Sequence, residues 1–274
     1  MEVITLQSGS SGNCIYVESD GIRLLFDAGI SGRQAEMRLR QYGKEIRDVD
    51  ALIISHDHSD HTQCMGPIHR KFGIPIYCTQ STFHSVDRRN KLGRVNDVRF
   101  FDVADDIRIE HLTIATIETP HDSHDSVIFI VDNTRRRLGI MTDLGHVFDG
   151  LASAIQTLDA VILESNYDVE MLKFGPYPPH LKKRIAGPGG HISNAESAQL
   201  LRNADPARLQ WACLAHLSEE NNDPDVALQT HRELLGDRFE LSCADRRMAS
   251  PVMRIDDPCE PLVENVRQSS NALF

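Results

Sequence analysis

The 274-residue chain contains no apolar run of roughly 18 or more residues, so it offers no candidate for a helix that crosses a bilayer. Its first residues, MEVITLQSGSSGN, lack the basic segment and apolar segment that together mark a secretory signal peptide. The six cysteines form no Cys-x-x-Cys pair and follow no regular spacing, which disfavours a disulfide framework. We therefore predict a cytoplasmic protein with reduced thiols and no membrane association.

The chain also lacks internal repeats, low-complexity segments and a Pro/Gly/Ser-rich linker. Its length alone favours one or two domains at about 150 residues each, and the missing linker favours one. A composition with 41% hydrophobic and 25% charged residues is ordinary for a globular protein and excludes disordered or fibrous classes. We predict one domain over residues 1–257, followed by a weakly patterned polar tail over 258–274.

Positive charge is scarce, because 40 acidic residues outnumber 29 basic ones and the formal net charge is −11. Such a surface repels nucleic acid, which argues against a polynucleotide substrate. Bound divalent metals would offset this repulsion locally. For any single basic cluster a solvated surface is the favoured explanation, but four clusters exist: 88–91, 135–137, 182–184 and 246–247.

Strand and helix patterns alternate along most of the chain. Hydrophobic alternation predicts strands over 2–6, 13–18, 23–27, 51–55, 75–78, 98–101, 111–119, 126–131, 137–141, 160–164, 212–216 and 239–242. Helical spacing predicts helices after Gly32, over 66–72, 81–90, 147–157, 179–186 and 194–203, and after Asp223. This mixture predicts a layered α/β protein with large sheets.

The decisive segment is Ser55-His56-Asp57-His58-Ser59-Asp60-His61, which directly follows an apolar strand. Neutral imidazole and carboxylate groups are the ligands that zinc and similar cations take. Without a metal, their burial together would carry a heavy desolvation cost. His56 and His58 are placed to share one ion, and Asp60 and His61 a second. A surface loop that is merely rich in His and Asp is the disfavoured alternative.

Three further predicted strands end in residues of the same kind. His121 follows strand 111–119, Asp143 follows strand 137–141, and His216 closes strand 212–216. A sheet edge holds side chains rigidly, so these residues are candidates to complete the ligand sets. We predict that His121 completes the first site, that His216 completes the second, and that Asp143 bridges both.

The His-x-His-x-Asp-His run, followed by separate His, Asp and His residues at strand ends, resembles the metallo-β-lactamase superfamily over roughly residues 1–255. This resemblance implies a single-domain α/β fold, the αββα sandwich, with a dinuclear metal site at one edge. Four further stretches are similar to the YycJ/WalJ-type branch of DNA exonucleases with this fold: 8–13, 163–168, 190–194 and 216–222.

The fold carries many hydrolases, so other residues must indicate the reaction. The histidine at position 58 differs from the Glu of the family's di-iron redox relatives and therefore favours hydrolysis. No TPGHT-like segment surrounds His121, which disfavours glyoxalase II-like thioesterases. The missing signal peptide disfavours a secreted β-lactamase.

The segment around His191 is the most useful discriminator. Ser193 and Glu196 form a capping box ahead of a helix, which places His191 just before a helix N-terminus that favours anions such as phosphate. The segment looks like the His-containing one that tRNase Z-type phosphodiesterases use. We predict that His191 contacts phosphate and protonates the leaving oxygen, with Ser193 and Asn194 nearby. A capping loop with a solvent-facing histidine is the alternative.

The loop over 8–13 is a second candidate for substrate contact through Ser10, Ser11 and Asn13, although a hairpin turn demands the same residue types. Glu164 or Asp168 is a candidate to orient a ligand histidine without itself binding metal. His146 is a candidate to line the pocket. His124 competes with His121 but lies farther from the strand.

We therefore predict a dinuclear metal-dependent phosphodiesterase in which a water shared by two ions attacks phosphorus. Asp60 or Asp143 assists its proton and His191 aids departure. The ions are zinc or manganese, with iron as a further possibility. The resemblance implies a 5′ exonuclease that acts on DNA. An RNase or small-molecule phosphodiesterase is the alternative, as is a lactonase or thioesterase of the same fold. A binding protein without catalysis is a third class, which the intact ligands disfavour.

Overall fold

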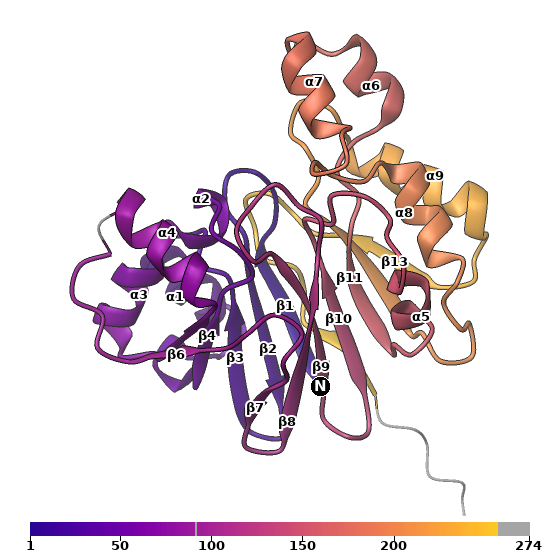
Figure 1. Cartoon of the computed structure of the whole chain (residues 1–274). Coiled ribbons are helices and arrows are strands. Elements are labelled where there is room, and N and C mark those ends of the chain that lie inside the picture. The colour runs from indigo at the N-terminus through magenta and orange to yellow at the C-terminus, as the bar shows by residue number, and fades with distance from the viewer. Residues whose placement is uncertain (91, 257–274) are drawn as a thin grey trace, which may run out of the picture.

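Two seven-stranded sheets lie face to face in the computed structural model, which describes residues 1–90 and 92–256 (Figure 1). The first sheet has the order β14 (Met253–Arg254), β1 (Glu2–Gln7), β2 (Cys14–Ser19), β3 (Ile22–Phe26), β4 (Ala51–Ile53), β5 (Ile76–Cys78) and β6 (Val98–Phe100). The second has the order β13 (Glu240–Cys243), β12 (Trp211–Ala215), β11 (Ala160–Glu164), β10 (Arg137–Met141), β9 (Val127–Asp132), β8 (Leu112–Glu118) and β7 (Ile107–Ile109).

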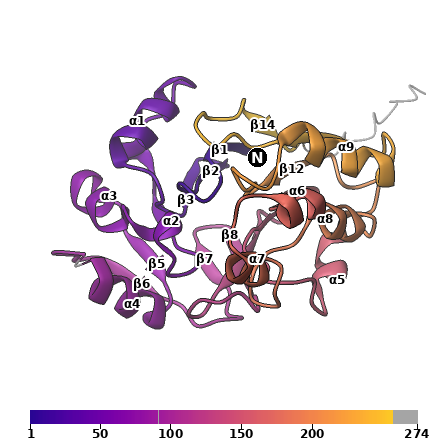
Figure 2. The same cartoon turned by 90° about the horizontal axis from the view of Figure 1, so that it is seen from above.

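Helices cover the outer face of each sheet, as Figures 1 and 2 show. The first sheet carries α1 (Gly32–Arg40), α3 (Met65–Phe72) and α4 (Gln80–Asn90), whereas the short α2 (Ser59–Thr62) lies at the strand ends (Figure 1). The 3₁₀ helix η1 (Ile46–Asp48) contacts α1. The second carries α5 (Leu151–Ile155), α8 (Asn194–Leu201) and α9 (Pro224–Leu235). The pair α6 (Val169–Phe174) and α7 (Pro179–Ile185) rises above the strand ends instead. This arrangement confirms the predicted αββα sandwich.

Each sheet is buried on both faces because its strands alternate between two apolar layers. In β2, Ile15 and Val17 point into the layer between the sheets, whereas Cys14 and Tyr16 point under the helices. The central layer joins both sheets, with the rings of Phe26 and Phe129 5.1 Å apart between centroids. The sheets therefore form a rigid frame for the loops at their edges.

The strand directions bring many strand ends to one edge of the frame. Strands β3 to β6 run parallel, as do β10 to β13, and β8 returns to the same direction after two antiparallel pairings. A hydrogen bond of 3.2 Å from the Val127 amide to the Ser55 carbonyl joins the two sheets at this edge. The amide of His216 likewise donates to the Ser8 hydroxyl at 2.9 Å.

Local sequence signals account for the helix ends. Ser31 with Gln34 and Ser193 with Glu196 form the capping boxes of α1 and α8. The predicted helix over 147–157 is shorter than expected, because Gly150 adopts a positive φ of 96° and α5 begins only after it. The short elements β7, β14, α2 and α6 were not predicted.

Two predictions concern residues that lie partly or wholly outside the described part of the chain. The predicted tail over 258–274 and Cys259 lie outside the described residues. Cys14, Cys64, Cys78, Cys213 and Cys243 are free thiols. Within residues 1–90 and 92–256, no helix is long and apolar enough to cross a membrane.

Candidate metal centre

The site lies at the shared edge, where several strands end in abrupt turns. Asp27 follows β3, Asp143 follows β10 and His216 follows β12, and these three residues have φ of +63°, +60° and +55°. A positive φ is uncommon outside glycine, and such strained residues cluster at functional sites. The turns end each strand at once and hold the three side chains at the edge of the sheet.

The first ligand cluster consists of His56, His58 and His121, whose candidate ligand atoms lie within 4.8 Å of one another. His121 Nε2 is 3.2 Å from His58 Nδ1, while His121 Nδ1 donates to the Gly190 carbonyl at 2.9 Å. That bond places the proton on Nδ1 and leaves the Nε2 lone pair for a cation. These are the three residues predicted to share one ion.

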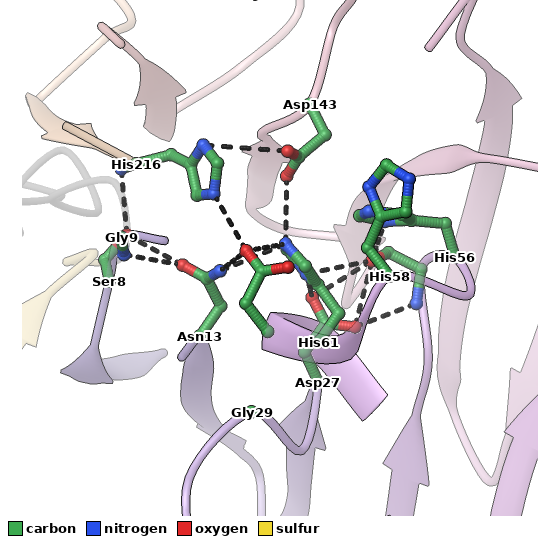
Figure 3. A network of polar contacts seen from close by, with 12 residues as sticks. Ser8, Gly9, Asn13, Asp27, Gly29, His56, His58, His61, Asp143 and His216 are labelled. Carbon is green, nitrogen blue, oxygen red and sulfur yellow. Dashed lines mark hydrogen bonds and ion pairs between the residues drawn. The ribbon is translucent and has the colours of Figure 1, made fainter. Parts of the chain in front are cut away.

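The second ligand cluster consists of Asp60, His61 and His216. Asp60 Oδ2 is 3.4 Å from both His61 Nε2 and His216 Nε2. His61 Nδ1 lies 2.7 Å from Asp27 Oδ2, which fixes the ring so that its other nitrogen faces the cluster (Figure 3). This is the predicted second set.

Asp143 stands between the two clusters and is almost fully buried. Its Oδ1 is 3.7 Å from His121 Nε2 and 3.6 Å from His216 Nδ1, and its Oδ2 is 3.3 Å from His61 Nε2 (Figure 3). The structure therefore places Asp143 where a residue that bridges both sites must lie.

Two buried atoms in this arrangement make no hydrogen bond within the described chain: Asp143 Oδ2 and His56 Nε2. A buried acceptor without a partner carries a large desolvation cost. Divalent cations satisfy both atoms, because a carboxylate oxygen and a neutral imidazole nitrogen are ligands of zinc and related metals. The donor set therefore fits a metal centre.

Electrostatics divide the histidines into two groups. Burial alone would lower the pKa of His61 and His216, but the carboxylates of Asp27, Asp60 and Asp143 outweigh it around His61 and hold its pKa well above the ordinary value. Asp143 and Asp60 do the same for His216 and raise its pKa to about 10. Without a cation, the second cluster therefore binds protons in its place.

His56 and His58 of the first cluster have pKa values shifted in the opposite direction. Burial lowers the pKa of His56 and His58, and the neighbouring imidazoles of His61 and His121 lower it further. These rings are therefore neutral at pH 7 and ready to bind a cation.

The loop over 8–13 supports the second cluster from the side. The side-chain amide of Asn13 lies 3.2 Å from Asp60 Oδ2 and 3.0 Å from His61 Nε2, and Asn13 Oδ1 accepts from the Gly9 amide at 2.8 Å (Figure 3). A Cβ at Gly29 would lie 1.7 Å from the Asp60 carbonyl oxygen, so only glycine permits this approach.

Asp27→Asn tests the support that Asp27 gives to His61. The amide keeps the shape but can no longer accept as a carboxylate, so we expect metal affinity to fall about 10- to 100-fold with the fold intact. Competition with a fluorescent zinc chelator measures the change. Asp223→Asn is the control, because Asp223 caps α9 and asparagine caps as well as aspartate. Equal affinities in both variants would contradict this role.

A cavity of about 360 Å³ opens beside the two clusters. Its walls include five of the site residues, Asp60, His58, Asp143, His191 and His216. The other lining residues are Ser10, Ser59, Arg89, Asn166, Tyr177, Leu181, Arg184, Ile185 and Ser218. This volume is within the range of small-ligand sites, and one nucleotide is of a size to enter it.

His191 lines this cavity directly beside the clusters, with its Nδ1 3.7 Å from Asp143 Oδ1. Its ring centroid is 5.1 Å from those of His121 and His216. Its Nδ1 is 2.6 Å from Oε1 of the fully buried Glu164, whose second oxygen accepts from the Leu144 amide at 2.9 Å. Glu164 thus orients His191, and the same oxygen lies 3.7 Å from Nδ1 of His216, one of the predicted ligands.

The structure places two of the predicted substrate contacts at the cavity and the others away from it. Ser10 and His191 line the cavity, whereas exposed Ser11 accepts from the Gln7 side chain at 3.2 Å. Asn13 is buried beside the second ligand cluster. Ser193 caps α8, a role that occupies its hydroxyl.

Asn194 is also turned away from the cavity. It is 1% exposed and bonds to Ser165 and Asn222 within the fold. Of the other candidates, Asp168 caps α6 and is not a partner of a ligand histidine. His146 contacts the Pro188 carbonyl outside the cavity.

Asp57, in the middle of the ligand motif, points away from both clusters. It pairs with Arg89 at 2.9 Å and lies 3.3 Å from His124 Nδ1, so it ties α4 to the motif. His124 is therefore separate from the ligands. Sequence reasoning missed Asp27 as a residue of this site, although Asp27 also directly follows an apolar strand.

Comparison with known proteins places the chain in a family. A family profile described as "Beta-lactamase superfamily domain" matches residues 22–216, more than half of the chain. The chain belongs to the beta-lactamase superfamily. Within this superfamily it is 32% identical to "Exodeoxyribonuclease YycJ" of Bacillus anthracis, over 91% of this chain and 97% of that protein. It is also 32% identical to "Exodeoxyribonuclease WalJ" of Streptococcus pneumoniae, over 82% of this chain and 84% of that protein. The predicted branch is thereby confirmed.

Solved structures share the superfamily fold at low identity. The metallo-beta-lactamase fold protein YhfI of Bacillus subtilis aligns with a TM-score of 0.69 at 17% identity, over 91% of this chain and 98% of that one. The short form of human tRNase Z aligns with a TM-score of 0.65 at 17% identity, over 93% and 100%. These similarities establish the fold, and the substrate has to be inferred from the residues of the site.

Proposed function

We propose that this chain is a metal-dependent phosphodiesterase that removes nucleotides from 5′ ends of DNA. The observation that carries the proposal is the complete ligand set facing His191, in a chain that matches two curated exodeoxyribonucleases over most of its length. We propose two divalent ions, zinc or manganese with iron as a further candidate, held by His56, His58, Asp60, His61, His121, Asp143 and His216. When bound, such ions acidify a water and neutralise charge on a phosphodiester.

The chain's own residues supply the proton transfers and the orientation. Asp60 and Asp143 lie at the cavity wall, and both have lowered pKa values because the imidazolium rings of His61 and His216 outweigh burial. Ionised at pH 7, they accept hydrogen bonds from an attacking water. His191 has Nδ1 held by Glu164, which leaves Nε2 to donate a proton to the leaving oxygen.

Two arginines of the cavity wall are candidates to contact a phosphodiester. Arg89 on α4 and Arg184 on α7 both line it, and each is held by an aspartate, Asp57 at 2.9 Å and Asp122 at 2.7 Å. Fixed guanidinium groups suit phosphate oxygens. We propose DNA as the substrate of this chain and the cytoplasm as its location.

Digestion of end-labelled DNA duplexes under defined salt and metal tests the function. We expect release of nucleotides from the 5′ end, dependent on added manganese or zinc and abolished by a chelator. A panel of RNA, bis-p-nitrophenyl phosphate and lactones runs in parallel. Cleavage of RNA alone, or fast lactone turnover with no phosphodiester hydrolysis, would overturn the proposal; cutting from 3′ ends would overturn its polarity.

His191→Ala tests the proton donor. We expect kcat on DNA to fall about 10²- to 10⁴-fold while the bound metal stays at the wild-type level, because this ring has a general-acid role and is not a ligand. His111→Ala, an exposed histidine on the β7–β8 hairpin, is the matched control. A parallel loss of metal would instead identify His191 as a ligand.

A further inference from the structure

The α6–α7 hairpin, residues 169–185, carries an apolar strip that the core does not use. Tyr177 directly precedes the N-cap of α7, Leu181 and Ile185 lie about one turn apart on that helix, and all three line the catalytic cavity. None of the residues of α7 is buried, and each of the three is only half-buried. This strip therefore stays partly exposed within the described part of the chain.

The other faces of the hairpin fix its position. Asp168 caps α6, and Lys182 Nζ donates to the Lys173 carbonyl at 2.8 Å, so the two helices are tied together. Arg184 holds Asp122 at 2.7 Å, and the His191 amide donates to the Ile185 carbonyl at 2.8 Å. The strip is therefore held in place before any ligand binds, which lowers the entropic cost of binding.

The strip and the predicted metal ligands line one cavity, and the α6–α7 hairpin rises above the strand ends that carry those ligands (Figure 1). His58, Asp60, Asp143 and His216 make a polar side, and the aromatic ring of Tyr177 lies on the apolar one. One guanidinium group lies next to the strip, because Arg184 also lines the cavity, where Asp122 holds it at 2.7 Å. An apolar planar group next to a phosphate matches this pattern.

We propose that Tyr177, with Leu181 and Ile185, is the stacking platform for the base of the terminal nucleotide, whose phosphodiester is cut at the ligand clusters. This inference rests on the proposed nuclease function and adds the contact that holds the DNA end. Stacking on a ring face tolerates any base. Because the platform consists of one aromatic ring and two aliphatic side chains, it suits an exonuclease that accepts all four bases.

Two matched oligonucleotides test the platform. They share one sequence, and the terminal nucleotide of the attacked end either carries its base or is abasic. For the wild-type protein we expect kcat/KM to be about 5- to 100-fold higher on the end that carries the base. Tyr177→Ala brings this ratio close to one, whereas Tyr177→Phe keeps it. Leu181→Ala, a second variant of the platform, lowers the ratio less.

Phe174→Ala is the control, because Phe174 is an aromatic of the same hairpin, is 74% exposed and does not line the cavity. It keeps the wild-type ratio, and metal content monitors the integrity of every variant. A wild-type ratio near one, an unchanged ratio in Tyr177→Ala, or an equal loss in Phe174→Ala overturns the platform while DNA cleavage persists. A wild-type protein that cuts no DNA overturns the proposed function, and the platform with it.

Discussion

Asp143→Asn is expected to lower the rate of phosphodiester hydrolysis by on the order of 10³-fold or more. Asp143 is the residue whose two oxygens face both ligand clusters, and its Oδ2 has no hydrogen bond within the described chain. The amide keeps the volume but removes the charge that holds the cations together. Metal ions contribute several kcal/mol of transition-state stabilisation, and each 1.36 kcal/mol is about tenfold in rate.

Steady-state hydrolysis of bis-p-nitrophenyl phosphate, with bound metal measured on the same samples, checks this expectation. Asp223→Asn makes the same carboxylate-to-amide change at the cap of α9 and keeps wild-type activity. Unchanged turnover and unchanged metal content in Asp143→Asn would show that Asp143 does not bridge two metal sites.

Removal of the metal is expected to reverse the pH dependence of stability between pH 6.5 and about 10. In the metal-free protein the pKa of His216 is raised to about 10 from an ordinary value of 6.5, against the effect of burial, by Asp143 and Asp60. A raised pKa contributes stability that is complete below pH 6.5 and is lost as the pH rises toward 10. His61 acts in the same direction.

His56 and His58 of the first cluster do not change this pH dependence of stability between pH 6.5 and about 10. The lowered pKa values of His56 and His58 mean that both rings are neutral above pH 6.5, so their contribution changes only at lower pH. The metal-bound protein has the opposite trend, because a cation must displace the protons of His61 and His216 and so binds more tightly as the pH rises.

Thermal unfolding at pH 6.5 and pH 9, with and without a chelator, measures both trends. We expect the melting temperature of the metal-free protein to fall with pH and that of the metal-bound protein to hold or rise. Calorimetry in buffers of different ionisation enthalpy is expected to detect proton release on metal binding. Parallel trends in both forms, with no proton release, would mean that these histidines are not ligands.

Sequence patterns predicted which His and Asp side chains gather at the shared edge, because each carries a local signal. His56 to His61 are neighbours in the chain, His216 directly follows an apolar strand, and Asp143 follows another after one intervening residue. The same signal was present at Asp27, but one aspartate after a strand is equally typical of a turn. Only the tertiary structure shows that β3 lies beside β4, which brings Asp27 to His61.

The substrate side of the site was harder to predict, because a cavity depends on contacts between distant segments. The capping box at Ser193 was read correctly as local structure, yet the contact of Asn194 with Asn222 could not be read from spacing. The helix over 179–186 was predicted, but α6 is too short to leave a periodic pattern. The position of Tyr177 at the cavity was therefore not foreseeable.

Anomalous diffraction at the absorption edge of the bound metal tests the central claim most directly. The account requires two peaks about 3.5–4 Å apart. One must contact His56, His58 and His121, the other must contact Asp60, His61 and His216, and Asp143 must lie between them. A single peak, or metal held by other residues while these side chains remain unbound, would contradict it.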